Sequence, residues 1–212
     1  MTGVDTYVVR VWLPDRPGAL GQVANRIGAV RGDVIGIDIL ERGGGLVVDE
    51  LMVSIPDGSS VDLLVAEIVQ VDGVAVEDVR RVASDRPEAG VQALHAAGRL
   101  AESDEEQRLE VLCREMVELV DGAWAVAFSV GDDRAVVTVG SPPESGWLAA
   151  FLVGSSHLGD TDQAAGAPGD LAWSRLPRHD LAVAIGREGR PFHTRERLYL
   201  NALGRIANAL SM

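Results

Sequence analysis

The strongest chemical signal in the sequence is the run Asp15-Arg16-Pro17-Gly18-Ala19-Leu20, which joins an alternating apolar segment to a segment with helical spacing. Pro17 suits the first turn of a helix, where its missing N–H is not needed, and Gly18 has no Cβ to keep a ligand from the backbone. The N–H groups of Gly18, Ala19 and Leu20 are predicted to face an anion, which the helix dipole favours by about 0.3–1 kcal/mol. A carboxylate fits such a site.

Asp15 adds the opposite charge beside those donors. Its carboxylate could accept hydrogen bonds from an ammonium group, so the run predicts binding of an amino acid or a similar small zwitterion. A purely local interpretation stays open, in which Asp15 caps the helix and the run is only a strand-to-helix turn.

The elements around this run follow from hydrophobic spacing. Alternation predicts strands near 7–13, 35–39 and 51–55 and, less regularly and therefore with a bulge, near 74–82; period 3.6 predicts helices at 20–30 and 61–68. The order β-α-β-β-α-β is that of a ferredoxin-like α+β fold. Two helices cover only one face of such a sheet, so Tyr7, Val8, Trp12 and Leu40 predict that a second copy or the second domain covers the other face, unless that face stays partly exposed.

Residues 6–82 resemble the ACT domain, a regulatory module of amino-acid metabolism. The matching segments are YVVRVWL, DRPGAL, ANRIGAVRG, the stretch Asp33-Val34-Ile35-Gly36-Ile37, and Asp72-Gly73-Val74. In ACT domains that bind amino acids, the ligand lies at a dimer interface, between this loop of one chain and the start of the second strand of the other. The resemblance implies a homodimer and a small-molecule ligand held by Asp15, the amides of Gly18, Ala19 and Leu20, and Asp33.

A turn-rich stretch at 84–90 marks the boundary between two domains, which we place at 1–83 and 102–212 with a linker helix at 84–101. Beyond it, Ser103 and Glu106 predict a capping box, 124–130 and 135–139 a hairpin, 181–187 a strand, and Thr194 the cap of a last helix. Periodicity does not decide whether 147–155 is a buried strand or a short helix. The pattern is that of a second α+β domain.

The second half resembles a GAF domain by element order over residues 102–210 and by motif over 181–210. GAF domains are cytosolic small-molecule sensors built on an antiparallel sheet with terminal helices. The resemblance implies a pocket near 147–173, shortened here, with a role in dimerisation or in binding an unknown ligand. Arg187 and Arg190 either contact a partner or brace Glu196 at the start of the last helix, and the brace is the favoured interpretation.

Composition narrows the functional classes. With 19 basic and 32 acidic residues the net charge is −13, which argues against direct binding to nucleic acid or to anionic membranes. The single cysteine, Cys113, lies on an apolar stripe and is predicted to be a buried, inert thiol, and the four histidines are scattered. No signal peptide or membrane span is apparent, so we expect a cytoplasmic protein.

We therefore expect a non-catalytic regulatory sensor without cofactor or metal. The alternative is a protein–protein interaction or dimerisation module without a small-molecule ligand. An enzyme with a site hidden near 147–173 is the third and weakest interpretation.

Overall fold

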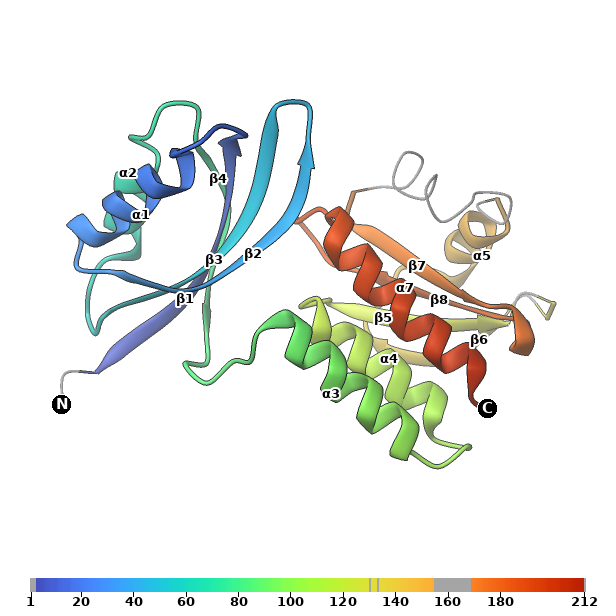
Figure 1. Cartoon of the computed structure of the whole chain (residues 1–212). Coiled ribbons are helices and arrows are strands. Elements are labelled where there is room, and N and C mark those ends of the chain that lie inside the picture. Colours follow the sequence, from blue (N-terminus) through green and yellow to red (C-terminus); the bar gives the residue numbers. More distant parts are fainter. Residues whose placement is uncertain (1–2, 130, 133, 155–168, 212) are drawn as a thin grey trace. The chain divides into compact units, whose positions relative to one another are not determined.

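The structure, a computed structural model, describes residues 3–129, 131–132, 134–154 and 169–211 (Figure 1). The chain divides into two compact units, Met1–Glu88 and Ala89–Met212, and each is described by itself. Within the described ranges, no helix is both long enough and apolar enough to cross a membrane.

The first unit has the predicted ferredoxin-like order, with two helices packed on one face of a four-stranded antiparallel sheet (Figure 1). The strands lie in the order β2-β3-β1-β4, so β2 and β4 form the edges. The elements are β1 (Val4–Pro14), α1 (Ala19–Ala29), β2 (Asp33–Gly43), β3 (Leu46–Pro56), α2 (Val61–Ile68) and β4 (Ala75–Val82).

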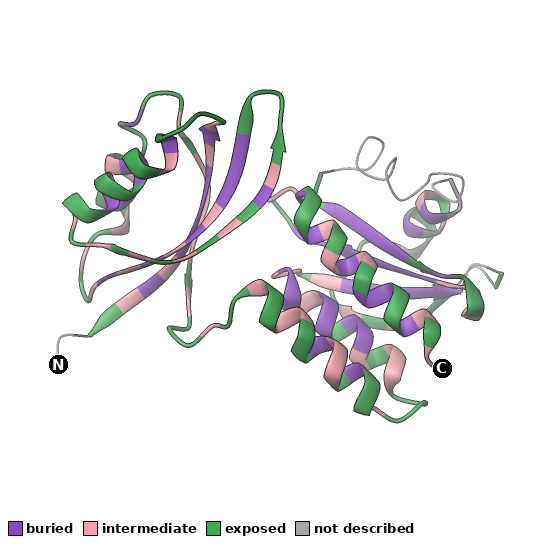
Figure 2. Ribbon diagram, in the orientation of Figure 1, coloured by how far each residue is buried: buried purple, intermediate pink, exposed green. Residues whose placement is uncertain are grey.

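Strict alternation builds the core of this unit. Alternate residues of β1 face the helices, and three of them, Val9, Val11 and Leu13, are buried together with apolar residues of α1 and α2 (Figure 2). The core includes Val9, Val11, Leu13, Val23, Ile27, Leu51, Leu64 and Ile68. The predicted bulge is present in β4, because Arg10 pairs with Asp78 and Val11 with Val76, which leaves Glu77 as an extra residue. Glu77 accepts a hydrogen bond from the Trp12 indole N–H at 2.9 Å.

The sheet face opposite the helices differs from the apolar surface that the sequence suggested. Its centre is a ladder of paired charges, in which the Glu50 carboxylate accepts from Arg10 at 2.6 Å and from Arg80 at 3.1 Å. Tyr7 packs against the core on the helix side. Exposed isoleucines lie instead on the edge strand β2, at Ile35, Ile37 and Ile39.

The second unit is an antiparallel sheet with helices on both faces. Its strands lie in the order β6-β5-β8-β7. Its elements are α3 (Ala89–Glu102), α4 (Arg108–Leu119), β5 (Trp124–Ser129), β6 (Arg134–Gly140), α5 (Ser145–Gly154), β7 (Leu171–Leu176), the 3₁₀ turn η2 (Pro177–His179), β8 (Leu181–Gly186) and α7 (Thr194–Ala209). Periodicity left the type of the segment 147–155 open; its residues 147–154 belong to the helix α5, and residue 155 lies outside the described residues.

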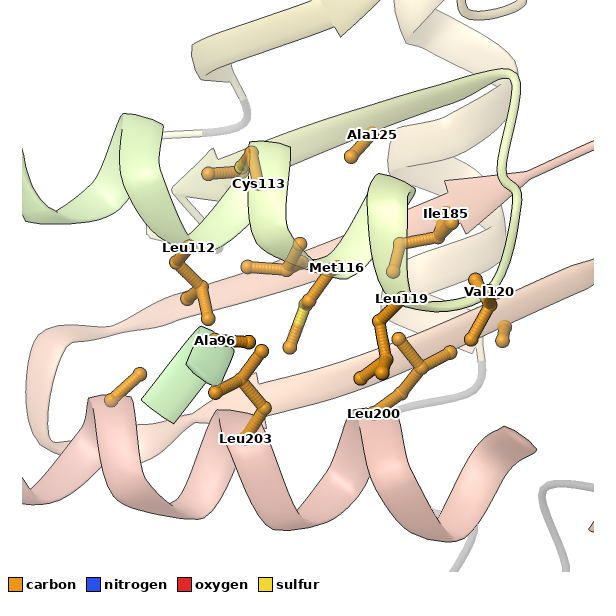
Figure 3. Packing of buried hydrophobic residues seen from close by; sticks show 14 of the residues in the cluster. Ala96, Leu112, Cys113, Met116, Leu119, Val120, Ala125, Ile185, Leu200 and Leu203 are labelled. Carbon is orange, nitrogen blue, oxygen red and sulfur yellow. The ribbon is translucent and has the colours of Figure 1, made fainter. Parts of the chain in front are cut away.

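Two cores flank this sheet. On one face, α3, α4 and α7 pack through residues such as Leu112, Met116 and Leu203 (Figure 3). On the other face, Leu148 and Leu152 of α5 pack against Phe128 and Trp173. Ala96 and Leu100 of α3 belong to the first of these cores, so this helix is an integral part of the second unit.

Two helix starts predicted for this unit were wrong. Ser103 does not open α4; its hydroxyl donates to the Leu100 carbonyl at 2.8 Å and so ends α3, and α4 begins only after Gln107. Thr194 is the first helical residue of α7, because His193 occupies the cap position and its backbone N–H donates to Glu196 at 2.9 Å. A hydroxyl near a helix boundary can serve either of two neighbouring helices, and sequence alone does not choose between them.

Cys113 is fully buried in the helical core, as predicted, and burial raises the pKa of its thiol to about 12. Since the thiolate is the reactive species, we expect the folded protein to resist a thiol reagent such as N-ethylmaleimide at pH 8. Mass spectrometry should show complete labelling in denaturant and almost none without it. Fast labelling of the folded chain would contradict the assigned burial.

Candidate functional site

The loop between β1 and α1 places the predicted ligand-binding run at one end of the first sheet. Gly18 is the N-cap of α1 and has a left-handed backbone, with a φ of 88° that favours glycine. No atom lies within 4 Å of the position a Cβ would take, so the space in front of Gly18 is open. Pro17 precedes the cap instead of standing in the first turn. The Asp15 N–H donates to the Gly45 carbonyl at 2.9 Å, which ties the loop to the β2–β3 turn.

Two of the three expected amides are available. The Ala19 N–H donates to the Arg16 carbonyl at 3.3 Å, which reduces its capacity to bind an anion. The N–H groups of Gly18 and Leu20 have no hydrogen-bond partner among the described residues. The start of α1 therefore presents two donors, aided by the helix dipole.

Asp15 stands beside these donors and is partly exposed. Its Oδ1 lies 3.8 Å from a guanidinium nitrogen of Arg42, whose side chain is itself 59% exposed. A pair this long and this open to water is weak and readily rearranged. The loop therefore carries an acceptor, Asp15, and the exposed cation Arg42 of the neighbouring strand β2 lies close to that acceptor.

Asp33 lies at the opposite end of the sheet from Asp15. It pairs with Ser54 near the end of β3, whereas Pro14, next to Asp15, pairs with Leu46 at the beginning of β3. Ser54 is eight positions after Leu46 on β3, a distance of about 27 Å at about 3.4 Å per residue. Asp15 and Asp33 of one chain therefore cannot contact the same small ligand.

Asp49 is the residue that the sequence interpretation missed. It lies on β3 opposite Val11, it is only 2% exposed, and it faces the helix side of the sheet together with Val47 and Leu51. Its Oδ1 has no hydrogen-bond partner among the residues that the structure describes. The signal was available, because Asp49 is a charge at an inward position of the alternating run Val47-Val48-Asp49-Glu50-Leu51.

The pKa of Asp49 is raised, mainly because burial disfavours its charged form; Arg42 lowers it and Asp15 raises it further. A raised pKa in the folded state means that this group's contribution to stability is fully present below the unfolded pKa of about 3.9 and is lost as pH rises through the folded value. We expect Asp49→Asn to raise the free energy of unfolding at pH 7 by about 1–3 kcal/mol, with the gain shrinking toward pH 4. Urea denaturation of both proteins between pH 4 and pH 7 measures this gain in stability. If Asp49→Asn is less stable than wild type at pH 7, the Asp49 carboxylate is not an unfavourably buried charge.

The second unit contains a pocket of about 1000 Å³ at one end of its sheet. Trp124 begins β5 at this end, Gly186 ends β8, and Trp147 of α5 and Arg190 complete part of the wall. A Cβ on Gly186 would lie 2.1 Å from the Trp124 ring, so the glycine allows the indole to lie against the strand. The pocket touches both ends of the stretch 147–173 where the sequence predicts one, while residues 155–168 of that stretch, with His157, lie outside the described residues.

Arg187, at the rim of this pocket, confirms the favoured interpretation of that residue as a brace. Its guanidinium makes two hydrogen bonds to the Glu196 carboxylate, of 2.7 and 2.8 Å, and both side chains are buried. Arg190 donates to the backbone carbonyl of Asp121 at 2.9 Å. Across the described part of the chain, no three His, Cys, Asp or Glu side chains are grouped as a metal site would require.

No family model and no curated protein matches the sequence. Among solved structures, an "unknown protein" from Galdieria sulphuraria is similar, with 15% identity, a TM-score of 0.34, and coverage of 47% of this chain and 66% of that one. The C-terminal domain of the MgtC protein from Mycobacterium tuberculosis has 21% identity, a TM-score of 0.33, and coverage of 41% and 96%. The ACT domain of GTP pyrophosphokinase from Chlorobium tepidum has 18% identity, a TM-score of 0.30, and coverage of 40% and 93%. These likenesses are low and assign no ligand to this chain.

Proposed function

We propose that this chain is a non-catalytic, cytoplasmic regulatory protein whose first unit binds an amino acid or a similar small zwitterion at the β1–α1 loop. The observation that supports this most strongly is the start of α1, where the space at Gly18 is open, two N–H groups have no partner among the described residues, and the Asp15 carboxylate lies in the same loop. Donors for a carboxylate and an acceptor for an ammonium group then lie within one loop.

We propose further that the site is shared between two copies of the chain. The edge strand β2 carries Ile35, Ile37 and Ile39, which are 47%, 51% and 36% exposed. Antiparallel pairing of β2 with β2 of a second copy would cover these residues and satisfy the unpaired backbone groups of both edges. It would also bring the start of one β2, with Asp33, next to the end of the other, with Arg42 and Gly43.

For the second unit we propose a GAF-like role in receiving or transmitting the signal, with the pocket near Trp124 and Trp147 as its site. Coupling between the units requires that the ligand bind one dimer geometry more tightly than another, because equal affinity for both shifts nothing.

Thermal denaturation of the full chain with each of the twenty amino acids tests the proposal. At about 100 times its Kd, a ligand should stabilise the fold by about 2.7 kcal/mol. Asp15→Asn should weaken the response, whereas Asp62→Asn, in the exposed first turn of α2, should leave it unchanged. A flat response to every amino acid would refute this function.

The exposed isoleucines of β2 also favour the second candidate, a dimerisation module without a ligand. The two candidates share the dimer and differ in the thermal response. A chain that is dimeric yet unaffected by every amino acid, with an Asp15→Asn variant that behaves like wild type, would favour this alternative.

A further inference from the structure

Asp49 is a charged side chain that the fold of the first unit does not explain. It stands on β3 among core positions, with Val47 two residues before it and Leu51 two residues after it on the same face. It is 2% exposed, and its Oδ1 is without a partner among the described residues. Burying a carboxylate oxygen without a partner is unfavourable, and no donor among the residues that the structure describes satisfies this oxygen.

The surroundings of Asp49 connect it to the β1–α1 loop. Two charges act on its carboxylate, those of Arg42 and Asp15. Asp15 belongs to the loop that leads into α1, and Arg42 lies 3.8 Å from it. On β1, its neighbour is the buried Val11. The carboxylate is therefore part of the same end of the sheet as the free amides.

The sheet next to Asp49 is exposed to solvent on the side of strand β2. Its partner across the ladder on β2 is Ile39, which is 36% exposed, and Ile37, opposite Leu51, is 51% exposed. The sheet face that the helices cover over β1 and β3 is thus uncovered one strand away, at β2. A small molecule lying against β2 at Ile39 would be one strand spacing, about 4.8 Å, from the position of Asp49 on β3.

We propose that Asp49 is the principal acceptor for the ammonium group of the ligand, and that the ligand is therefore a small primary amine with a carboxylate close to it. This inference rests on the proposed zwitterion site and adds a residue to it. The α1 amides and Arg42 face the carboxylate of the ligand, while Asp49 and Asp15 face its ammonium group. Asp49 supplies within one chain the second carboxylate that Asp33 can supply only from another copy.

An internal partner is the competing explanation for Asp49. Arg42 is long enough to be considered, because its position on β2 pairs with Val47. Its side chain is however 59% exposed, and a nitrogen of its guanidinium lies 3.8 Å from the Asp15 carboxylate. If Arg42 neutralised Asp49, replacing either residue would weaken the fold and the ligand would play no part.

The experiment measures thermal shifts of the full chain with the twenty amino acids and with amines that lack the carboxylate, such as ethanolamine and histamine. Three proteins are compared: wild type, Asp49→Asn, and Asp62→Asn as a matched loss of an exposed carboxylate in the same unit. We expect Asp49→Asn to weaken binding at least about tenfold, the loss typical of a charge-assisted hydrogen bond, and the control to bind like wild type.

Each outcome decides between the claims. If amino acids stabilise wild type and the control but not Asp49→Asn, the result supports both the zwitterion site and the role of Asp49 as its ammonium acceptor. If amino acids have no effect while an amine stabilises wild type and not Asp49→Asn, the zwitterion function is refuted, but Asp49 still binds an ammonium group. The role of Asp49 as ammonium acceptor is overturned if no compound stabilises wild type, or if Asp49→Asn binds as tightly as wild type. An Asp49→Asn protein that is less stable than Arg42→Gln and wild type without ligand would also overturn it, because Asp49 would then be structural.

Discussion

Replacing Glu196 by Gln is expected to lower the free energy of unfolding of the second unit by about 3–5 kcal/mol. The Glu196 carboxylate accepts two hydrogen bonds from Arg187, and a third from the backbone N–H of His193. Arg187 also donates to the carbonyls of Val120 and Pro191 and stacks over Phe192, 4.0 Å from the ring centre. The pair thus joins the end of β8, the end of α4 and the start of α7. A neutral amide would leave a buried guanidinium without its counter-charge.

Glu110→Gln is the matched control for this variant. Glu110 pairs with Arg114 one helical turn away on the exposed surface of α4, so its loss should change stability by less than about 0.5 kcal/mol. Tryptophan fluorescence in a urea titration follows the second unit well, because Trp124, Trp147 and Trp173 lie there. Equal midpoints for the two variants would show that the buried pair contributes little.

The architecture of the first unit could be predicted from the sequence because each of its elements is amphipathic. Val9, Val11 and Leu13 alternate with outward residues, and Val23 and Ile27 recur at helical spacing, so the period of each segment identifies its type. Even the bulge in β4 left a signal, since the core-facing valines Val76 and Val79 are three residues apart instead of two. The β1–α1 loop could be placed for the same reason, because it stands between two recognisable elements.

Residue patterns were less informative where the same pattern fits two kinds of secondary structure or two cap positions. In α5, Trp147, Leu148, Phe151 and Leu152 form a nearly continuous apolar segment, which fits a buried strand as well as a helix; only the packing of Leu148 and Leu152 on Phe128 and Trp173 settles it. The cap of α7 was misplaced by one residue because a buried histidine at that position is not a typical helix cap.

The candidate site was only partly predictable, and Asp49 shows why. A sequence pattern identifies a strand by its average alternation, and one inward charge in a run that includes Val47, Leu51 and Val53 hardly alters that average. Whether the carboxylate finds a partner depends on Arg42 and Asp15, which come from distant parts of the chain. The competition of Arg16 for the Ala19 amide is likewise set by the geometry of the turn, which the residue types alone do not specify.

The edge strand β2 is expected to be the dimer interface, and Ile37→Lys should abolish it. Ile37 lies near the middle of β2 and is 51% exposed. In a two-fold antiparallel pair of β2 strands the substitution occurs twice, so the complex loses two apolar contacts and brings two positive charges together. At about 1.5 kcal/mol for each site, dimerisation should weaken by at least about a hundredfold.

Leu63→Lys separates this effect from a general effect of added charge. Leu63 is 52% exposed on α2 of the same unit, so the control makes the same chemical change at a similar exposure but away from the β2 edge. Sedimentation velocity over a range of protein concentrations should show dimers for wild type and Leu63→Lys and monomers for Ile37→Lys. If Ile37→Lys remains dimeric, the copies associate through another surface, and Asp33 of a second copy then has no route to the β1–α1 loop. Binding at that loop would in that case have to depend on the groups of one chain, with Asp15 and Asp49 as its carboxylates.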